Sequence, residues 1–220
     1  NTPTILIVRK AKAMGIPKKI KDIILRRLSC LKFAQRRVLD AASVIGEEFD
    51  VELLSTVLGQ DSLDILETLN VLAHSTSLVC VEENRYRFDH ARSRETLYEE
   101  LSPPLKRGYH KRIGEKLEGI QGFALPLSDL AYHFTQAGNK EKSLKYALTA
   151  GKDELARFSN AQAIKHFQYV LQNITDESSE EKRTALEGLG DAYAASSMYE
   201  EAIKTFDQLA ANETGAIRLR

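Results

Sequence analysis

The chain lacks tryptophan, and its 220 residues include only two cysteines and five prolines. Cys30 and Cys80 are far apart and belong to no CxxC or Cys/His spacing, so neither a disulfide-rich scaffold nor a zinc site is indicated. We expect both thiols to be buried and reduced, which favours a cytoplasmic location. The apolar run at residues 5–8 is too short for a signal sequence or a membrane span.

Sequence signatures of catalysis are also missing. There is no GxxxxGK[ST] loop, so this chain alone is not expected to hydrolyse ATP. The histidines are scattered, without HExxH or paired ligand spacing, and no metal site is predicted; they are His74, His90, His110, His133 and His166. No Ser/His/Asp or Cys/His set follows from the spacing. We therefore predict no catalytic residue here, and a regulatory function.

The formal net charge of the chain is zero, but basic and acidic residues are unevenly distributed along it. Residues 1–60 carry 11 Lys and Arg against 6 Asp and Glu, and the remaining residues carry 20 against 25. A mildly basic front of this kind is usually a solvated surface and only a weak indication of an acidic partner. High charge (28%), 43% hydrophobic residues and little glycine or proline are typical of a mainly helical protein.

Apolar residues recur at helical spacing through the first third of the chain, which predicts helices over about 18–31, 33–45, 50–58 and 61–75. Phe33 and Val38 belong to the predicted apolar stripe of the second helix. Asp50 and Asp61 are suited to cap the third and fourth helices, and Gly59 to end the third.

The period then changes from 3.6 to 2, which predicts one β-hairpin with strands at 78–81 and 85–88. Helical periodicity returns at 90–101 and 105–118, with Leu105 in the apolar stripe of the later helix. Three helices followed by a hairpin give the order of a winged-helix domain. We assign 16–120 to that domain with its flanking helices, and 1–15 to an arm or the tail of a preceding domain.

Residues 127–220 are predicted to form tetratricopeptide-like helical hairpins, a solenoid truncated at its C-terminus. The last pair of helices carries small and large residues at the positions that such a repeat requires: Leu186, Leu189, Gly190, Tyr193, Ala202 and Phe206. Its AxxxF pattern recurs 39 positions earlier at Ala163 and Phe167. Capping boxes that begin at Ser159, Ser178 and Ser197 predict the starts of the last three helices. Stacked repeats usually present a concave side to a peptide or partner helix, although they can also be plain spacers.

DNA binding is the first function to consider for a winged helix, whose third helix usually enters the major groove. Here the helix at 61–75 carries Asp61, Asp64 and Glu67 and no Lys or Arg, so readout by that helix is not expected. Nucleic acid could instead meet one of two basic faces, residues 18–27 or the face that carries Lys106, Arg107, Lys111 and Arg112, and such binding would depend steeply on salt. Two further functions are compatible with the sequence: a plain interaction scaffold, and the regulatory part of an enzyme whose catalytic domain lies outside these residues.

Several segments resemble the region that follows the nucleotide-binding core of STAND ATPases, the signal-transducing NTPases related to the bacterial maltose regulator and to plant NB-ARC proteins. They are residues 17–28 (PKKIKDIILRRL) and 38–46 (VLDAASVIG). The most specific is 86–98 (YRFDHARSRETLY), followed by LSP at 101–103. It is similar to the FxHxLxREALYxxLSP stretch of predicted ATPases in this group.

The resemblance implies a switch made of an upstream ATPase module that binds ADP or ATP, a winged helix, and a repeat sensor for a protein, peptide or small inducer. In NB-ARC relatives a Met-His-Asp motif places its histidine near the ADP β-phosphate, and His90 occupies that place. Phe88 and Asp89 depart from the residues that precede it, and Ala91 replaces the aspartate that follows. Arg94, one turn on, could support the same surface. His90 and Arg94 are therefore the expected nucleotide-sensing residues, with no cofactor bound by this region alone.

Overall fold

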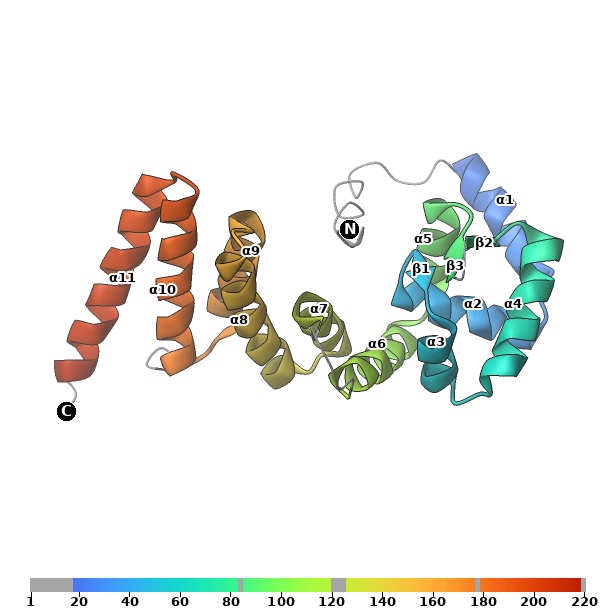
Figure 1. The fold of residues 1–220 in the computed structure, drawn as a ribbon, viewed down its shortest axis with the longest axis horizontal. Helices are drawn as coiled ribbons and strands as arrows, with labels where there is room; N and C mark the ends of the chain where they lie inside the picture. Colours follow the sequence, from blue (N-terminus) through green and yellow to red (C-terminus); the bar gives the residue numbers. More distant parts are fainter. Residues whose placement is uncertain (1–17, 83–84, 120–125, 177–178, 219–220) are drawn as a thin grey trace. The chain divides into compact units, whose positions relative to one another are not determined.

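The computed structural model describes residues 18–82, 85–119, 126–176 and 179–218 (Figure 1). In this part of the chain the structure is mainly helical, with eleven helices and one small sheet of three strands. The chain divides into two units, Asn1–Gly119 and Ile120–Arg220. Residues 1–15, predicted as an arm or tail, lie outside the described residues.

The first unit contains six helices and all three strands. Its elements in chain order are α1 (Lys18–Ser29), α2 (Phe33–Ile45), β1 (Glu48–Phe49), α3 (Val51–Leu58), α4 (Ser62–Thr76), β2 (Val79–Glu82), β3 (Arg85–Phe88), α5 (Ala91–Glu100) and α6 (Pro103–Glu118). Asp50 caps α3 by accepting from the Glu52 and Leu53 amides, and Gly59 ends it in the left-handed conformation. Asp61 caps α4 through the Leu63 amide. These caps match the sequence prediction.

The sheet has one strand more than predicted. β2 and β3 form the expected antiparallel hairpin, and β1 pairs with the other edge of β3, so the strand order is β1-β3-β2. Phe49 of β1 is buried and its ring lies 5.5 Å from that of Phe88. The predicted hairpin is confirmed, and only β1 was not predicted, because a two-residue strand is too short to show a period of 2.

The core of this unit is centred on α2, whose small residues Ala41, Ala42 and Ser43 are fully buried and allow close packing of neighbouring helices. Two residues expected in the core lie outside it: Phe33 is 84% exposed and Leu105 is 44% exposed. Each stands in the first turn of its helix. The two cysteines were also predicted to be buried, but Cys30 is exposed and Cys80 is half-buried; both are free thiols.

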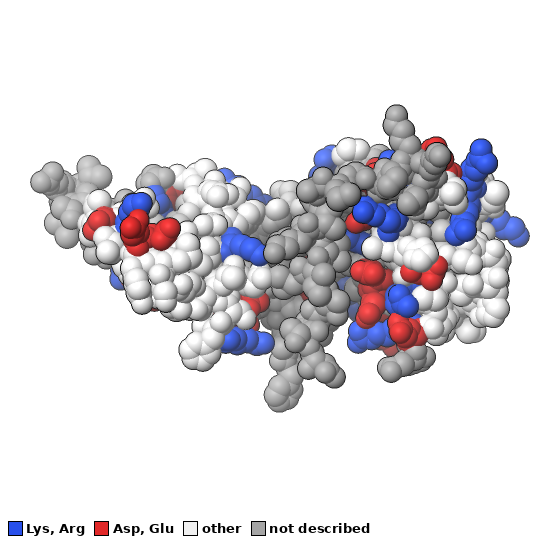
Figure 2. Space-filling model, turned by 90° about the horizontal axis from the view of Figure 1, so that it is seen from above, with Lys and Arg blue, Asp and Glu red and all other residues white. Residues whose placement is uncertain are grey.

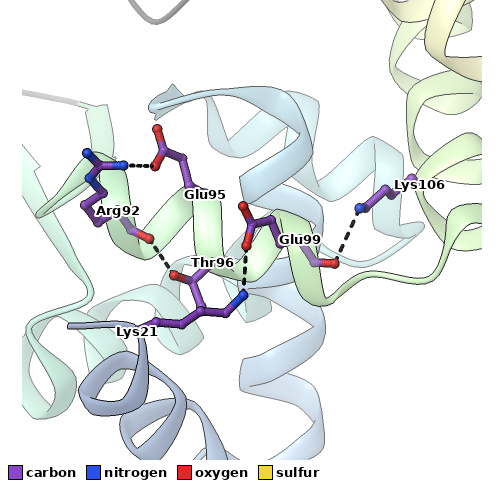
Figure 3. A network of polar contacts seen from close by, with 6 residues as sticks. All are labelled: Lys21, Arg92, Glu95, Thr96, Glu99 and Lys106. Atoms are coloured by element: carbon purple, nitrogen blue, oxygen red, sulfur yellow. Dashed lines mark hydrogen bonds and ion pairs between the residues drawn. The ribbon is translucent and has the colours of Figure 1, made fainter. Parts of the chain in front are cut away.

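A polar network joins α1, α5 and α6 on the surface of the first unit (Figure 3). Lys21 Nζ lies 2.9 Å from Glu99 Oε2, and hydrogen bonding to this carboxylate raises the pKa of Lys21. Lys106 Nζ donates to the Glu99 carbonyl and lies 4.6 Å from the centre of the Tyr98 ring. The network thus attaches the end of α5 to α1 through Lys21 and to the start of α6 through Lys106.

The second unit is a row of antiparallel helices, each packed on the next (Figure 1). They are α7 (Leu127–Ala137), α8 (Lys140–Ala156), α9 (Asn160–Asn173), α10 (Glu180–Ala195) and α11 (Tyr199–Arg218). The predicted capping boxes were only partly right. Ser159 precedes α9 but makes no capping bond, Ser179 caps α10 through the Lys182 amide, and Ser197 has a φ of 60° two residues before α11. Ser178 lies outside the described residues.

Candidate functional site

His90 lies at the junction between the hairpin and α5. The fully buried Phe88 ring anchors the end of β3, and the Asp89 amide donates to the Leu78 carbonyl at 3.0 Å. His90 then takes the N-cap position of α5, with an extended backbone and no capping bond from its side chain. Its imidazole is 73% exposed, and Nε2 lies 3.3 Å from a carboxylate oxygen of Asp89.

The exposed imidazole stands beside an end of a helix that favours anions. The first turn of α5 contains no acidic residue, so its free amides and the helix dipole are not neutralised there by a side chain of the helix. The Asp89 carboxylate is the opposing charge, because it competes with an incoming anion for the His90 ring. With Nε2 directed at Asp89, the ring can donate to a phosphate from Nδ1 when both nitrogens carry protons, or from either N–H after it turns away from Asp89.

Arg94 does not share this surface. Its guanidinium donates to the Ser43 carbonyl of α2 at 3.0 Å, and the side chain is half-buried. Arg94 therefore attaches α5 to the central helix of the unit, and it supports His90 by positioning α5.

The basic residues proposed as a contact surface are largely engaged within the protein. Arg112 donates to the Val57 carbonyl at 2.7 Å, Lys106 lies over Tyr98, and Lys111 is 3.9 Å from Glu115. Arg107 is exposed. On the face shown in Figure 2, Lys and Arg occur in small groups interspersed with Asp and Glu, separated by uncharged areas. No continuous basic surface is visible among the described residues on that face.

The predicted repeat residues of the second unit are brought together in α9, α10 and α11. Leu186, Leu189, Ala202 and Ala163 are buried. Gly190 lies against the Phe206 ring, where an added Cβ would be 2.6 Å from two ring carbons. The Tyr193 hydroxyl accepts from Gln168 Nε2 of α9 at 2.8 Å, so this tyrosine links its own helical hairpin to the preceding one.

The same glycine–phenylalanine contact occurs one repeat earlier. Gly151 of α8 lies against the Phe167 ring of α9, where an added Cβ would be 2.7 Å from the ring. Both couples are separated by 16 positions, and they are displaced by 39 along the chain. A glycine inside a helical pattern suggests an interruption of the helix. In the structure α8 is continuous through Gly151, and the missing side chain gives room to Phe167.

A groove of about 380 Å³ opens between α8 and α10, with Phe167 at its base. The α8 side contributes the apolar Leu155 and Ala156 with Lys152, and the α10 side contributes Thr184, Gly188 and the acidic Glu187 and Asp191, so the lining carries charges of both signs. This is a surface that could hold an extended or helical peptide with an apolar and a basic side chain.

One arrangement in the second unit could not be found from sequence spacing. The Ser128 hydroxyl of α7 lies 3.1 Å from His166 Nε2 and 3.4 Å from a carboxylate oxygen of Glu154. A hydroxyl has one proton to donate. When Ser128 donates this proton to Glu154, its oxygen accepts a hydrogen bond from the N–H at His166 Nε2. In that arrangement His166 cannot remove the proton of the serine hydroxyl. The three residues come from three successive helices and attach α7 to the row.

Within the part of the chain that the structure describes, no group of three or more His, Cys, Asp or Glu side chains is placed to hold a metal ion. None of the described helices has both the length and the apolar character that a membrane crossing requires. Comparison with protein-family models, curated proteins and solved structures finds no match.

Proposed function

We propose that this chain is the regulatory, non-catalytic part of a STAND-type ATPase of the cytoplasm. In this proposal the chain couples the nucleotide bound by an upstream ATPase module to the binding of a protein partner or inducer. The output is signal transduction or the regulation of transcription. The first unit is the part that responds to nucleotide, and the second is the part that binds the partner.

The order of elements in the first unit supports a winged helix. Three helices are followed by a hairpin, and a short strand between the first two, α2 and α3, adds to the sheet, which gives α2-β1-α3-α4-β2-β3. The Arg94 bond holds α5 against α2, so a force on His90 would be transmitted to the core of the unit. Such a rigid connection is what a nucleotide-dependent domain movement needs.

The duplicated couples Gly151–Phe167 and Gly190–Phe206 support tetratricopeptide-like repeats with a spacing of 39 residues, longer than the usual ~34. The single observation that carries partner binding is the groove between α8 and α10. A purely architectural spacer has no need of an open groove that is apolar on one side and lined by charged side chains.

The nucleotide part of the proposal is tested in the longer polypeptide that includes the expected ATPase module. We expect His90→Ala to accelerate the release of a fluorescent ADP analogue, because one donor to the β-phosphate is lost. His74→Ala is the matched control, since His74 is an exposed histidine of α4 that bonds only within its own helix in the described structure. Equal release rates for His90→Ala and the unsubstituted protein would contradict nucleotide sensing by this residue.

A scaffold indifferent to nucleotide is the second candidate, and the groove favours it equally. In that case the partner affinity of the longer polypeptide is the same with ADP and with ATP. Nucleic-acid binding is less favoured, because α4 carries no cation and Arg112 is committed to the Val57 carbonyl. If it occurs, binding should fall steeply as salt rises.

A further inference from the structure

The outer side of α4 is apolar as well as its inner side. Ile65, Leu69 and Leu72 face the core and are buried. Leu63 is 61% exposed, and Leu66 and Val71 are also exposed. We call the exposed set Leu63, Asp64, Leu66, Glu67 and Val71 the α4 outer face.

This face also carries negative charge that no Lys or Arg of the same helix balances. Residues 61–76 contain three carboxylates and no Lys or Arg. Asp61 is used as the N-cap of the helix. Asp64 and Glu67 are exposed, and neither forms an ion pair with any residue that the structure describes. The α4 outer face therefore presents apolar groups flanked by free negative charge.

A second surface of the same unit has the opposite character. A pocket of about 220 Å³ lies between the start of α2 and the start of α6, and its lining residues are Phe33, Arg36, Arg37, Asp40, Leu105 and Tyr109. Phe33 and Leu105 are the two residues that sequence periodicity placed in the core and that are exposed instead. We call this the α2–α6 pocket.

Positive charge predominates around the pocket. Arg36 Nε lies 2.7 Å from Asp40 Oδ1, so the one carboxylate among the lining residues is already engaged in an ion pair. Arg37 donates to the Leu58 carbonyl at 3.0 Å, and the nearby Arg112 donates to that of Val57. Hydrogen bonds to carbonyl groups leave the guanidinium charges in place, so the lining holds two cations, Arg36 and Arg37, against the single carboxylate of Asp40, and Arg112 lies outside it.

The two surfaces point in different directions. α4 and α6 each pack on α2 and α3, and Figure 1 shows α3 between them. The α4 outer face is turned away from α2, whereas the pocket is formed by α2 itself with α6. They cannot meet within one molecule, but each complements the other in charge and apolar character.

We propose that the α4 outer face of one copy of this chain docks in the α2–α6 pocket of a second copy. Leu63 or Leu66 enters beside Phe33, and Asp64 and Glu67 face the arginines. The pocket is larger than the cavity of about 150 Å³ that binds benzene in an engineered protein, so one branched side chain fits. Because two different surfaces meet, the contact is heterologous and propagates head to tail into a ring or a filament.

The test is sedimentation velocity of the 220-residue chain from about 10 µM to about 1 mM, the range of weak protein contacts. Phe33→Glu blocks the pocket, and Leu63→Lys blocks the α4 outer face; both side chains are mostly exposed, so the fold should be kept, as circular dichroism would verify. Phe158→Glu removes an exposed phenylalanine of the second unit and is the control for general apolar association.

We expect the unsubstituted chain and Phe158→Glu to associate as concentration rises, more weakly at high salt. Each blocked variant alone should remain monomeric. An equimolar mixture of the two should form a one-to-one dimer and nothing larger, because only one intact face and one intact pocket remain. The proposal is overturned by a monomeric unsubstituted chain, by association that survives either substitution, or by a mixture that stays monomeric.

Discussion

Gly188 of α10 and Phe167 of α9 are in direct contact, and a Cβ on Gly188 would overlap the end of the Phe167 ring. Gly151 of α8 lies against the same ring from the preceding helix. One fully buried aromatic side chain thus occupies the space that two glycines leave on either side of it. The groove between α8 and α10 has this ring at its base, so packing and the candidate binding surface depend on the same contact.

The first prediction concerns Gly188→Ala. Alanine favours a helix by about 1 kcal/mol over glycine, but here overpacking against Phe167 should cost about 1–3 kcal/mol. We therefore expect Gly188→Ala to lower the free energy of unfolding of the second unit, measured from its transition in urea. Gly108→Ala in α6 is the control, because nothing lies within 4 Å of its added Cβ, and it should stabilise the protein. Equal stabilisation by both substitutions would contradict the contact.

The second prediction is that Phe167→Leu relieves the effect of Gly188→Ala. Alone, Phe167→Leu leaves space between two glycines and should destabilise the second unit. Combined with Gly188→Ala, the smaller side chain makes room for the new methyl group, so the double variant should be more stable than the sum of the single changes predicts. Residues in contact typically show coupling of about 0.5–3 kcal/mol in such a cycle. Additive changes would show that the ring and the glycine do not compete for space.

Both glycine–phenylalanine couples could have been read from the sequence, since each spans 16 positions. The AxxxF pattern indicated Phe167, but nothing in the pattern shows that Gly151, in another helix, makes room for its ring. Gly188 cannot be identified in this way, because it contacts Phe167 but does not belong to either of the two glycine–phenylalanine couples with the 16-residue spacing. Its function follows only from the way α10 stacks on α9.

Helix positions and caps in the first unit follow from local chemistry, and Asp50 and Gly59 were identified correctly for that reason. β1 could not be predicted, because two residues become a strand only by pairing with β3. Phe33 and Leu105 were placed in the core because periodicity shows which side of a helix is apolar. It does not show where along the helix the neighbouring element ends.

The third prediction compares two arginines of α5. Arg94→Ala removes the hydrogen bond to the Ser43 carbonyl of α2, and charged hydrogen bonds contribute about 1.5–3 kcal/mol. Arg92→Ala removes only an ion pair with Glu95 one turn away on the same helix, which contributes about 0.3–0.5 kcal/mol. Urea unfolding should therefore show a clearly larger loss for Arg94→Ala. Similar losses would mean that Arg94 is not what attaches α5 to α2.

The last prediction concerns His110 of α6, which is fully buried and whose Nε2 lies 3.0 Å from the Tyr98 hydroxyl of α5. Burial, with a smaller contribution from Lys106, lowers the pKa of His110 from 6.5 to about 4. Between these values the unfolded chain binds a proton that the folded chain does not. Stability from this residue is therefore complete above pH 6.5 and is lost as the pH falls toward 4.

At pH 5 the loss should amount to about 2 kcal/mol relative to pH 7, at about 1.36 kcal/mol for each pH unit below 6.5. His110→Gln keeps a hydrogen-bonding group near Tyr98 but cannot titrate, so it should lower stability at pH 7 and flatten its dependence between pH 5 and 7. His90→Gln, the same substitution at a mostly exposed ring, is the matched control, and it should keep the contribution of His110 to the pH dependence. Urea unfolding at the two pH values measures both effects, and an unchanged pH dependence in His110→Gln would show that the His110 proton is not linked to folding.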